Sequence, residues 1–204
     1  MGFYNDIILP RLCSFAMRNK QLVPFRERVI GAAEGRVLEI GVGSGMNLPF
    51  YRPPVREVLA LEPAQRLVSM ARGVTCNMPV SFLEASAEAI PLDAHCVDTV
   101  VTTWTLCSIP HGATALAEIR RVLRPGGKLL FVEHGLAPDE GVRWWQDRLT
   151  PAWRRFTGGC HLNRPIRSMI EGAGFHIDRI ETGYMPGLKP MTSRRRAAEL
   201  NECR

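Results

Sequence analysis

The features that this sequence lacks exclude several classes of protein. It contains no apolar run approaching the ~20 residues of a membrane-spanning helix. Its opening stretch, MGFYNDIILPRLCSF, has an acid and a proline where a secretory signal has a basic segment followed by unbroken apolar residues. Its six cysteines form no C-x-x-C pair, so we expect reduced, mostly buried thiols and no metal site. A cytoplasmic protein is the resulting expectation.

Positive charge is not concentrated enough to indicate nucleic-acid binding. The net charge of +6 is spread along the chain, except for a cluster at Arg194, Arg195 and Arg196. Scattered charge is typical of a solvated surface, so no nucleic-acid partner is expected. The 204 residues, 46% of them apolar, suit one globular domain, 1–204, with a sizeable core. Contact with a membrane surface stays open, and the sequence does not determine the oligomeric state.

Short apolar segments alternate with helical patterns along most of the chain. We expect strands at 36–41, 57–62, 80–85, 96–103, 127–134 and 175–184. We expect helices between them at about 63–72, 112–123 and 164–173. This alternation, with strands apolar on both sides, predicts an α/β fold with a doubly wound, mostly parallel sheet between two helical layers.

Two segments lie outside the alternation, residues 1–30 and about 139–162. The first has apolar residues at helical spacing, interrupted by Pro10, and the second has an apolar helical stripe that contains Pro151. Both segments could cover the core, or both could be lids on the substrate side of the sheet. Tyr4 and Trp145 could wall an acceptor pocket or lie in the core.

The stretch VLEIGVGSG places Gly41, Gly43 and Gly45 directly after the first expected strand. In a doubly wound sheet, ligands bind at the carboxyl ends of the strands, and glycines there let the backbone approach a ligand closely. A dinucleotide loop has the pattern G-x-G-x-x-G, but its sixth position here is Met46. The loop therefore favours a nucleotide-like ligand other than NAD, although a nicotinamide-dependent oxidoreductase remains the alternative.

Two carboxylates accompany this loop. Glu62 follows Gly41 by 21 residues, at the end of the second expected strand, where a carboxylate can accept both ribose hydroxyls. Glu39 stands two residues before the first glycine, where it would repel a phosphate but suit an ammonium group. Alternatively, Glu39 bonds the amides of the loop itself. S-adenosylmethionine has a ribose, an ammonium and no phosphate.

Four segments together resemble the class I S-adenosylmethionine-dependent methyltransferases, over about residues 35–185. These segments are VLEIGVGSG, LALEP, AHCVDTVVTT and EIRRVLRPGGKLLF. More narrowly, ILPRL, GSGMNLPFY and WWQDRLTPAWRRFTGGCHLNRP resemble a small bacterial branch that is similar to the mammalian alkyl thiol methyltransferases. Sequences of this kind are also labelled phosphatidylethanolamine or quinone methyltransferases.

The resemblance implies a Rossmann-like methyltransferase with S-adenosylmethionine as its cofactor. The residues that it implies for cofactor binding are Glu39, Gly41, Gly43, Gly45, Glu62, Pro63, Ser86, Ala87, Glu88 and Thr103. The glycines and Glu39 would hold the methionine end, and Thr103 would lie under the sulfonium. Glu62 would hold the ribose, and the remaining residues would flank the adenine. The segment 193–204, SRRRAAELNECR, departs from the family's final aromatic strand and predicts a polar helical tail instead.

Methyl transfer from a sulfonium is an in-line displacement, so a base is needed only for an acceptor that carries a proton. His134 ends the fifth expected strand and could be that base, or it could be a structural histidine. His161 is the second candidate for the base, or it could instead brace the lid segment at about 139–162.

The acceptor itself is less well defined. The segment TTWTLCS replaces the N/D-P-P-Y/F segment of enzymes that methylate exocyclic amines of bases, so a small-molecule or lipid-like thiol, amine or hydroxyl is expected. An alternative outside the enzymes is a non-catalytic cofactor-binding or RNA-associated module with a basic tail.

Overall fold

The structure, a computed structural model, describes residues 8–184 and 197–203 of the chain. Tyr4 and the basic cluster Arg194–Arg196 lie outside the described residues. No helix within the described part is long and apolar enough to cross a membrane.

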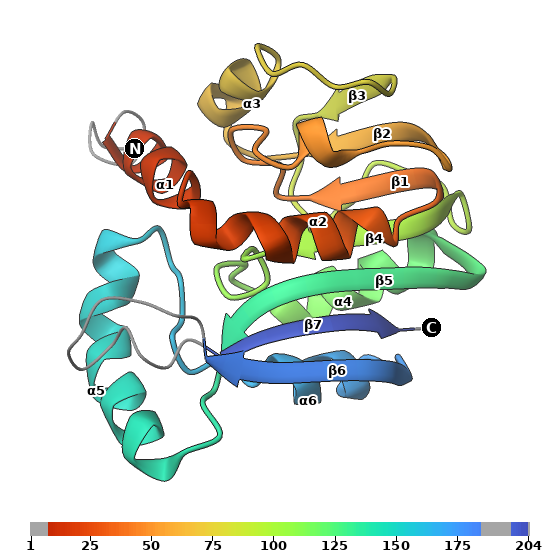
Figure 1. The fold of residues 1–204 in the computed structure, drawn as a ribbon. Coiled ribbons are helices and arrows are strands. Elements are labelled where there is room, and N and C mark those ends of the chain that lie inside the picture. Colours follow the sequence, from red (N-terminus) through yellow and green to blue (C-terminus); the bar gives the residue numbers. More distant parts are fainter. Residues whose placement is uncertain (1–7, 185–196, 204) are drawn as a thin grey trace.

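A twisted seven-stranded sheet forms the middle of the molecule, with the order β3-β2-β1-β4-β5-β7-β6 (Figure 1). The strands are β1 (Gly35–Ile40), β2 (Val55–Leu61), β3 (Val80–Leu83), β4 (Val97–Thr103), β5 (Leu123–Gly135), β6 (Ile177–Tyr184) and β7 (Ala197–Cys203). The first five strands pair in parallel. The six strands expected from the alternation are therefore confirmed, as is the doubly wound arrangement with β1 and β4 adjacent at its centre.

Helices cover both faces of this sheet. They are α1 (Leu9–Met17), α2 (Val23–Gly31), α3 (Gln65–Ala71), α4 (Gly112–Val122), α5 (Glu140–Phe156) and α6 (Ile166–Gly172), with short 3₁₀ turns η2 (Lys20–Leu22) and η3 (Leu48–Phe50). The buried side of α2, with Val29 and Ile30, packs on one face of the sheet. Leu116 and Ile119 of α4 and Ile170 of α6 pack on the other. This arrangement confirms the three-layer fold.

The expectation of a polar helical tail is wrong for Ala197–Cys203. This segment is β7, which pairs antiparallel with β5 on one side and with β6 on the other. The alanine and glutamate residues of AAELNEC favour a helix by intrinsic propensity, but the difference between residue types is only a few tenths of a kcal/mol per residue. Backbone hydrogen bonding along two neighbouring strands outweighs that preference.

In the two segments outside the alternation, α1 and α5 stand at the carboxyl edge of the parallel strands, whereas α2 lies over a face of the sheet (Figure 1). Pro10 is the second residue of α1, where its missing N–H has no intrahelical partner to lose, so it starts the helix rather than interrupting it. The apolar stripe of α5 remains largely outside the core, with Trp145 41% and Phe156 66% exposed. This helix therefore does not pack its stripe on the sheet.

Candidate functional site

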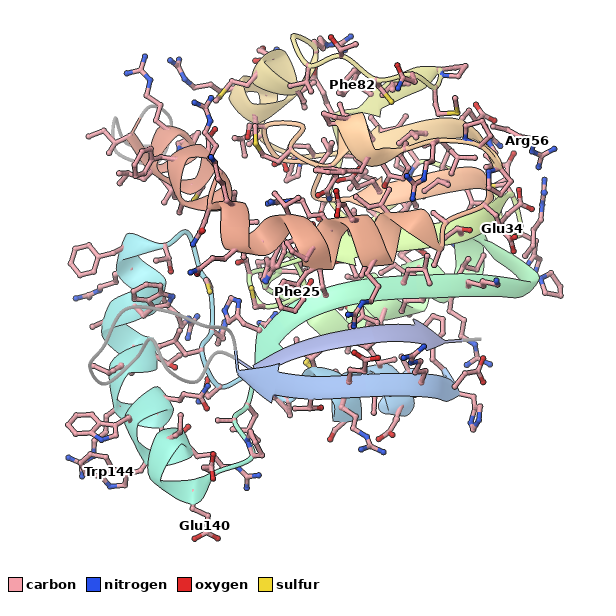
Figure 2. All side chains as sticks on the ribbon, in the orientation of Figure 1. Phe25, Glu34, Arg56, Phe82, Glu140 and Trp144 are labelled. Carbon is pink, nitrogen blue, oxygen red and sulfur yellow. The ribbon has the colours of Figure 1, made fainter. Side chains whose placement is uncertain are left out.

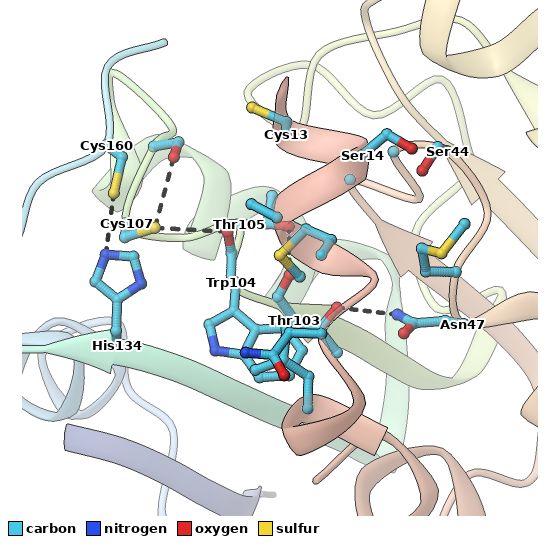
Figure 3. Close-up of a pocket in the computed structure, with 18 of the residues that line it drawn as sticks. Cys13, Ser14, Ser44, Asn47, Thr103, Trp104, Thr105, Cys107, His134 and Cys160 are labelled. Carbon is cyan, nitrogen blue, oxygen red and sulfur yellow. Dashed lines mark hydrogen bonds between the residues drawn. The ribbon is translucent and has the colours of Figure 1, made fainter. Parts of the chain in front are cut away.

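A cavity of about 930 Å³ opens at the carboxyl ends of β1, β4 and β5. Its walls come from the loop after β1, the segment after β4, the end of β5, and residues of α1, α2 and α5. We call it the ligand cavity, and Figure 3 shows it with the side chains that surround it. Its size is in the range of small-molecule sites. Of the residues predicted from sequence, Gly41, Gly43, Thr103 and His134 line it.

The glycines of the loop after β1 differ in what surrounds them. Gly41 has φ +68°, and a Cβ there would lie 2.5 Å from Cγ2 of Thr105, so its role is to let β1 and the segment after β4 pack together. Gly43 has φ +56°, but a Cβ there would meet no protein atom closer than 3.9 Å. Gly43 therefore leaves free space beside the backbone on the cavity side, as close approach of a ligand requires. Gly45 packs against Ala71 of α3.

Glu62, at the end of β2, fastens this loop. One carboxylate oxygen accepts from the amide of Gly43 at 3.1 Å, and the other accepts from the amide of Ala64 at 3.0 Å. Burial raises the pKa of Glu62, and the two backbone hydrogen bonds oppose that rise. The sequence left open whether Glu39 bonds the loop amides. In the structure, Glu62 makes such a bond.

Glu39 instead belongs to a buried polar network with Asn47 at its centre. The side-chain amide of Asn47 donates to Glu39 at 2.8 Å and to Thr103 Oγ1 at 2.9 Å, while its carbonyl accepts from Arg26 Nε at 2.9 Å. Burial raises the pKa of Glu39 to about 7, against hydrogen bonds from Asn47 and Tyr51 and the charge of Arg26. Among the described residues, the second oxygen of Glu39 has no hydrogen bond that meets normal geometry. The Tyr51 hydroxyl also lacks such a bond and lies close enough to lower the pKa of Glu39, and Glu39 itself is not part of the described cavity wall.

The residues assigned to the adenine end lie outside the wall of the ligand cavity. Pro63 is exposed just after β2, and Ala87 packs in the hydrophobic core. Ser86 Oγ accepts from the amide of Glu88 at 3.2 Å, and the Glu88 carboxylate accepts from the amide of His111 at 2.8 Å. These residues follow β2 and β3 at the same edge of the sheet, and their part in cofactor binding stays a prediction.

At the other end of the ligand cavity, His134 lies next to two cysteines. Its Nε2 is 3.0 Å from Sγ of Cys160, and the ligating atoms of Cys107, His134 and Cys160 all lie within 4.8 Å of one another (Figure 3). We call these three residues the Cys–His–Cys cluster. Hydrogen bonding between the thiols lowers the pKa of Cys160, with further lowering by His134, and raises the pKa of Cys107. Sequence reasoning found His134 but missed both cysteines, because only the fold brings these distant positions together.

Several hydrogen bonds fix the segments that carry this cluster. The buried carboxylate of Glu133 accepts from the amides of Thr105 and Leu106 at 2.8 and 2.9 Å, just before Cys107. The carbonyl of Cys107 accepts from the amide of His161 at 2.9 Å, which ties the Cys107 segment to the Cys160 segment. The His161 ring also lies 3.2 Å from that carbonyl and is not part of the cavity wall, so its position matches the bracing role.

The ligand cavity contains little charge. Arg26 is the only Asp, Glu, Lys or Arg in its described wall. Its guanidinium lies 5.1 Å from the centre of the Trp104 ring and donates to the carbonyl of Met17 at 2.9 Å. A role for Arg26 in the cavity was not predicted from the sequence, because the residues of α2 show only a helical pattern.

Comparison with known proteins finds relatives of this chain among methyltransferases. The sequence model of the family described as a methyltransferase domain matches residues 38–131, which include the glycine loop, β4 and most of β5. Thiol S-methyltransferase TMT1B of Rattus norvegicus is 34% identical over 154 residues, covering 72% of this chain and 63% of that protein. Thiol S-methyltransferase TMT1A of Homo sapiens is 36% identical over 147 residues, covering 68% of this chain and 59% of that protein. The chain thus spans less than two thirds of the length of either relative.

Solved structures show the same fold. A chain from the complex of the Haloferax volcanii Trm112 methyltransferase activator with a methyltransferase superimposes with a TM-score of 0.73 at 19% identity. The match covers 95% of this chain and 92% of that chain. The Rossmann-like fold predicted from sequence is therefore confirmed.

Proposed function

Because the chain belongs to the class I S-adenosylmethionine-dependent methyltransferases, we propose that it transfers a methyl group from S-adenosylmethionine to the sulfur of a small, largely apolar thiol. The observation that carries the proposal is the ligand cavity, where the glycine loop and the Cys–His–Cys cluster face one space. Holding the two reactants in line there supplies much of the acceleration, since the sulfonium is already an activated leaving group.

The residues at the glycine loop fit the methionine end of the cofactor. The free space beside Gly43 admits a ligand against the backbone. The oxygen of Glu39 without a well-formed hydrogen bond suits the cofactor ammonium, and the Arg26 guanidinium in the cavity wall suits its carboxylate. We assign Glu62 to the ribose and to holding the loop, and Pro63, Ser86, Ala87 and Glu88 to the adenine side.

The chemistry of the cavity favours a thiol over an amine. Near the Cys–His–Cys cluster the described cavity wall contains no carboxylate that could hold an ammonium acceptor, and Glu39, outside the wall beside Asn47, is the carboxylate assigned to the cofactor ammonium. A neutral thiol needs no such partner. The two relatives named thiol S-methyltransferases support the same choice.

A thiol must lose its proton before its sulfur can attack the methyl group. We assign that activation to His134, which lines the cavity and contacts Cys160. The acceptor must also be present as a reduced thiol. The five cysteines whose side chains are described are free, which supports a reducing cytoplasmic setting.

Two measurements test the proposal. Calorimetry with S-adenosylmethionine, S-adenosylhomocysteine and NAD should show binding of the first two and none of NAD. Mass spectrometry should then detect methylation of a small alkyl thiol, but not of the amine or alcohol with the same carbon chain. NAD binding without S-adenosylmethionine binding would overturn the family chemistry, and methylation of the amine alone would overturn the acceptor class.

A further inference from the structure

We propose that the Cys–His–Cys cluster binds one Zn²⁺ and that the acceptor thiol becomes the fourth ligand of this ion. The inference rests on the proposed function for the identity of the acceptor, but the metal site itself rests on the three side chains. They come from three separate segments: the loop after β4, the end of β5, and the loop after α5.

The three ligating atoms are close to the arrangement that zinc requires. They lie within 4.8 Å of one another, and tetrahedral Zn²⁺ with bonds of about 2.0–2.3 Å separates its ligand atoms by roughly 3.5–3.8 Å. The 3.0 Å contact between His134 Nε2 and Cys160 Sγ therefore has to widen by about half an ångström. A change of this size is within the reach of side-chain rotation. Two thiolates and one imidazole are a ligand set that zinc prefers.

The segments that carry the ligands are fixed before any ion binds. Glu133 holds the amides just before Cys107, and the amide of His161 holds the carbonyl of Cys107. Such bonds to the ligand-bearing segments are the support that metal sites need. Cys107 is 1% and Cys160 8% exposed, so both thiol ligands are shielded from bulk solvent, and His134 is half-buried.

Three protein ligands leave one tetrahedral position open, which is the mark of a catalytic rather than a structural zinc site. All three residues line the ligand cavity, together with Thr103 and Trp104 at the end of β4. In Figure 3 these two residues lie between the cluster and Asn47 of the loop after β1. A sulfur bound to the open position would therefore lie in the space that the cavity shares with the glycine loop.

With zinc bound, the ion would activate the thiol in place of His134, whose Nε2 would then be a zinc ligand rather than a base. The acceptor thiol binds Zn²⁺ and releases its S–H proton to solvent, because the metal lowers the thiol pKa. A lone pair of the zinc-bound thiolate then forms the new S–CH₃ bond. The bond between the methyl carbon and the sulfonium breaks, and its electron pair stays on the cofactor sulfur, giving neutral S-adenosylhomocysteine. The thioether product is a weaker ligand than the thiolate and leaves.

Titration of the reduced full chain with Co²⁺, under anaerobic conditions, tests the site. Wild type should bind one Co²⁺ and show both a thiolate-to-cobalt charge-transfer band and tetrahedral d–d bands, which Zn²⁺ then removes by displacement. Cys107→Ser and Cys160→Ser should lose most of the charge-transfer band. Cys96→Ser, which alters a half-buried thiol before β4, is the matched control and should keep the full spectrum. Absence of the wild-type bands, or their persistence in both cluster variants, overturns the proposal.

Assays on the same samples separate this inference from the proposed function. Calorimetry with S-adenosylmethionine reports whether each variant is folded and binds cofactor. Removing metal with EDTA should abolish thiol methylation without loss of cofactor binding, and Zn²⁺ should restore it. Undiminished thiol methylation by metal-free protein would overturn the zinc inference and leave the proposed function intact. Cobalt binding by a protein that methylates no thiol would support the metal site and overturn the acceptor role.

Discussion

Replacing Glu39 with glutamine should change how the stability of this protein depends on pH. Glu39 is fully buried, and burial raises its pKa from 4.5 to about 7. Glutamine keeps a carbonyl oxygen for the hydrogen bond from Asn47, and its amide group takes the place of the oxygen that has no well-formed bond. The substitution therefore removes the charge and conserves most of the geometry.

The size and sign of the effect follow from linkage. The folded chain holds the Glu39 proton more tightly than the unfolded chain, so the stabilisation by that proton is complete below about pH 4.5 and is lost as pH rises through 7. One pKa unit corresponds to about 1.4 kcal/mol, so the difference amounts to roughly 3 kcal/mol. We expect Glu39→Gln and wild type to be similarly stable at pH 5, and the variant to be more stable by up to about 3 kcal/mol at pH 8.

Urea unfolding at a series of pH values measures this difference. Glu84→Gln, which neutralises an exposed carboxylate, is the control and should follow the wild-type curve.

Cofactor affinity gives a second readout, because pairing with an ammonium requires ionised Glu39. Wild type should bind S-adenosylmethionine about tenfold more weakly at pH 6 than at pH 8, and Glu39→Gln should bind weakly at both. Parallel stability curves for wild type and Glu39→Gln between pH 5 and 8 would refute the reasoning.

Four further substitutions test the assignments made for the cofactor and the acceptor. Glu62→Ala removes both the loop hydrogen bonds and the proposed ribose contact, so calorimetry should show S-adenosylmethionine binding weakened by roughly 30- to 150-fold, or about 2–3 kcal/mol; a change below threefold in folded protein would contradict the assignment. Gly43→Ala and Gly41→Ala both put an alanine at positive φ and should both lower the melting temperature, but Gly41→Ala should lower it more because its Cβ also meets Thr105, and Gly43→Ala should weaken cofactor binding more; the reverse ranking would contradict these roles for the two glycines. His134→Gln should slow thiol methylation by about 10²- to 10⁴-fold in single-turnover assays and leave cofactor binding nearly unchanged; equal rates would leave His134 a structural residue.

The parallel strands could be predicted because their sequence signal is local. Segments such as RVLEIG and GKLLFVEH are apolar on both sides, and the glycines after the first of them mark the edge where the cavity lies. The segment AAELNEC carries no such signal, because β7 is specified by its two neighbours in the sheet rather than by its own pattern. Local propensity therefore gave the wrong element there.

The residues of the candidate site also differ in whether their position could be predicted from local sequence. Thr103 and His134 lie at strand ends and Gly43 lies in the loop just after β1, and all three line the ligand cavity. Cys107 and Cys160 lie on connecting segments, and their proximity to His134 depends on how three loops fold over the sheet. The expectation of no metal site came from the absence of a C-x-x-C pair, and that pattern carries no information on ligands assembled from distant positions. Figure 2 shows other charged side chains, among them Glu34, Arg56 and Glu140, at the outer edges of the molecule.

The position of β7 has a consequence for the order in which the molecule assembles. In the sheet, β7 lies between β5 and β6, although it follows β6 along the chain. During synthesis β6 emerges before the strand that bridges it to the sheet, so its main-chain groups have no strand partner until β7 has been made. The region from β1 to β5 can pair without either strand. We therefore expect refolding in two stages, with amides of β1 and β4 protected from hydrogen exchange before those of β6, and simultaneous protection would contradict this order.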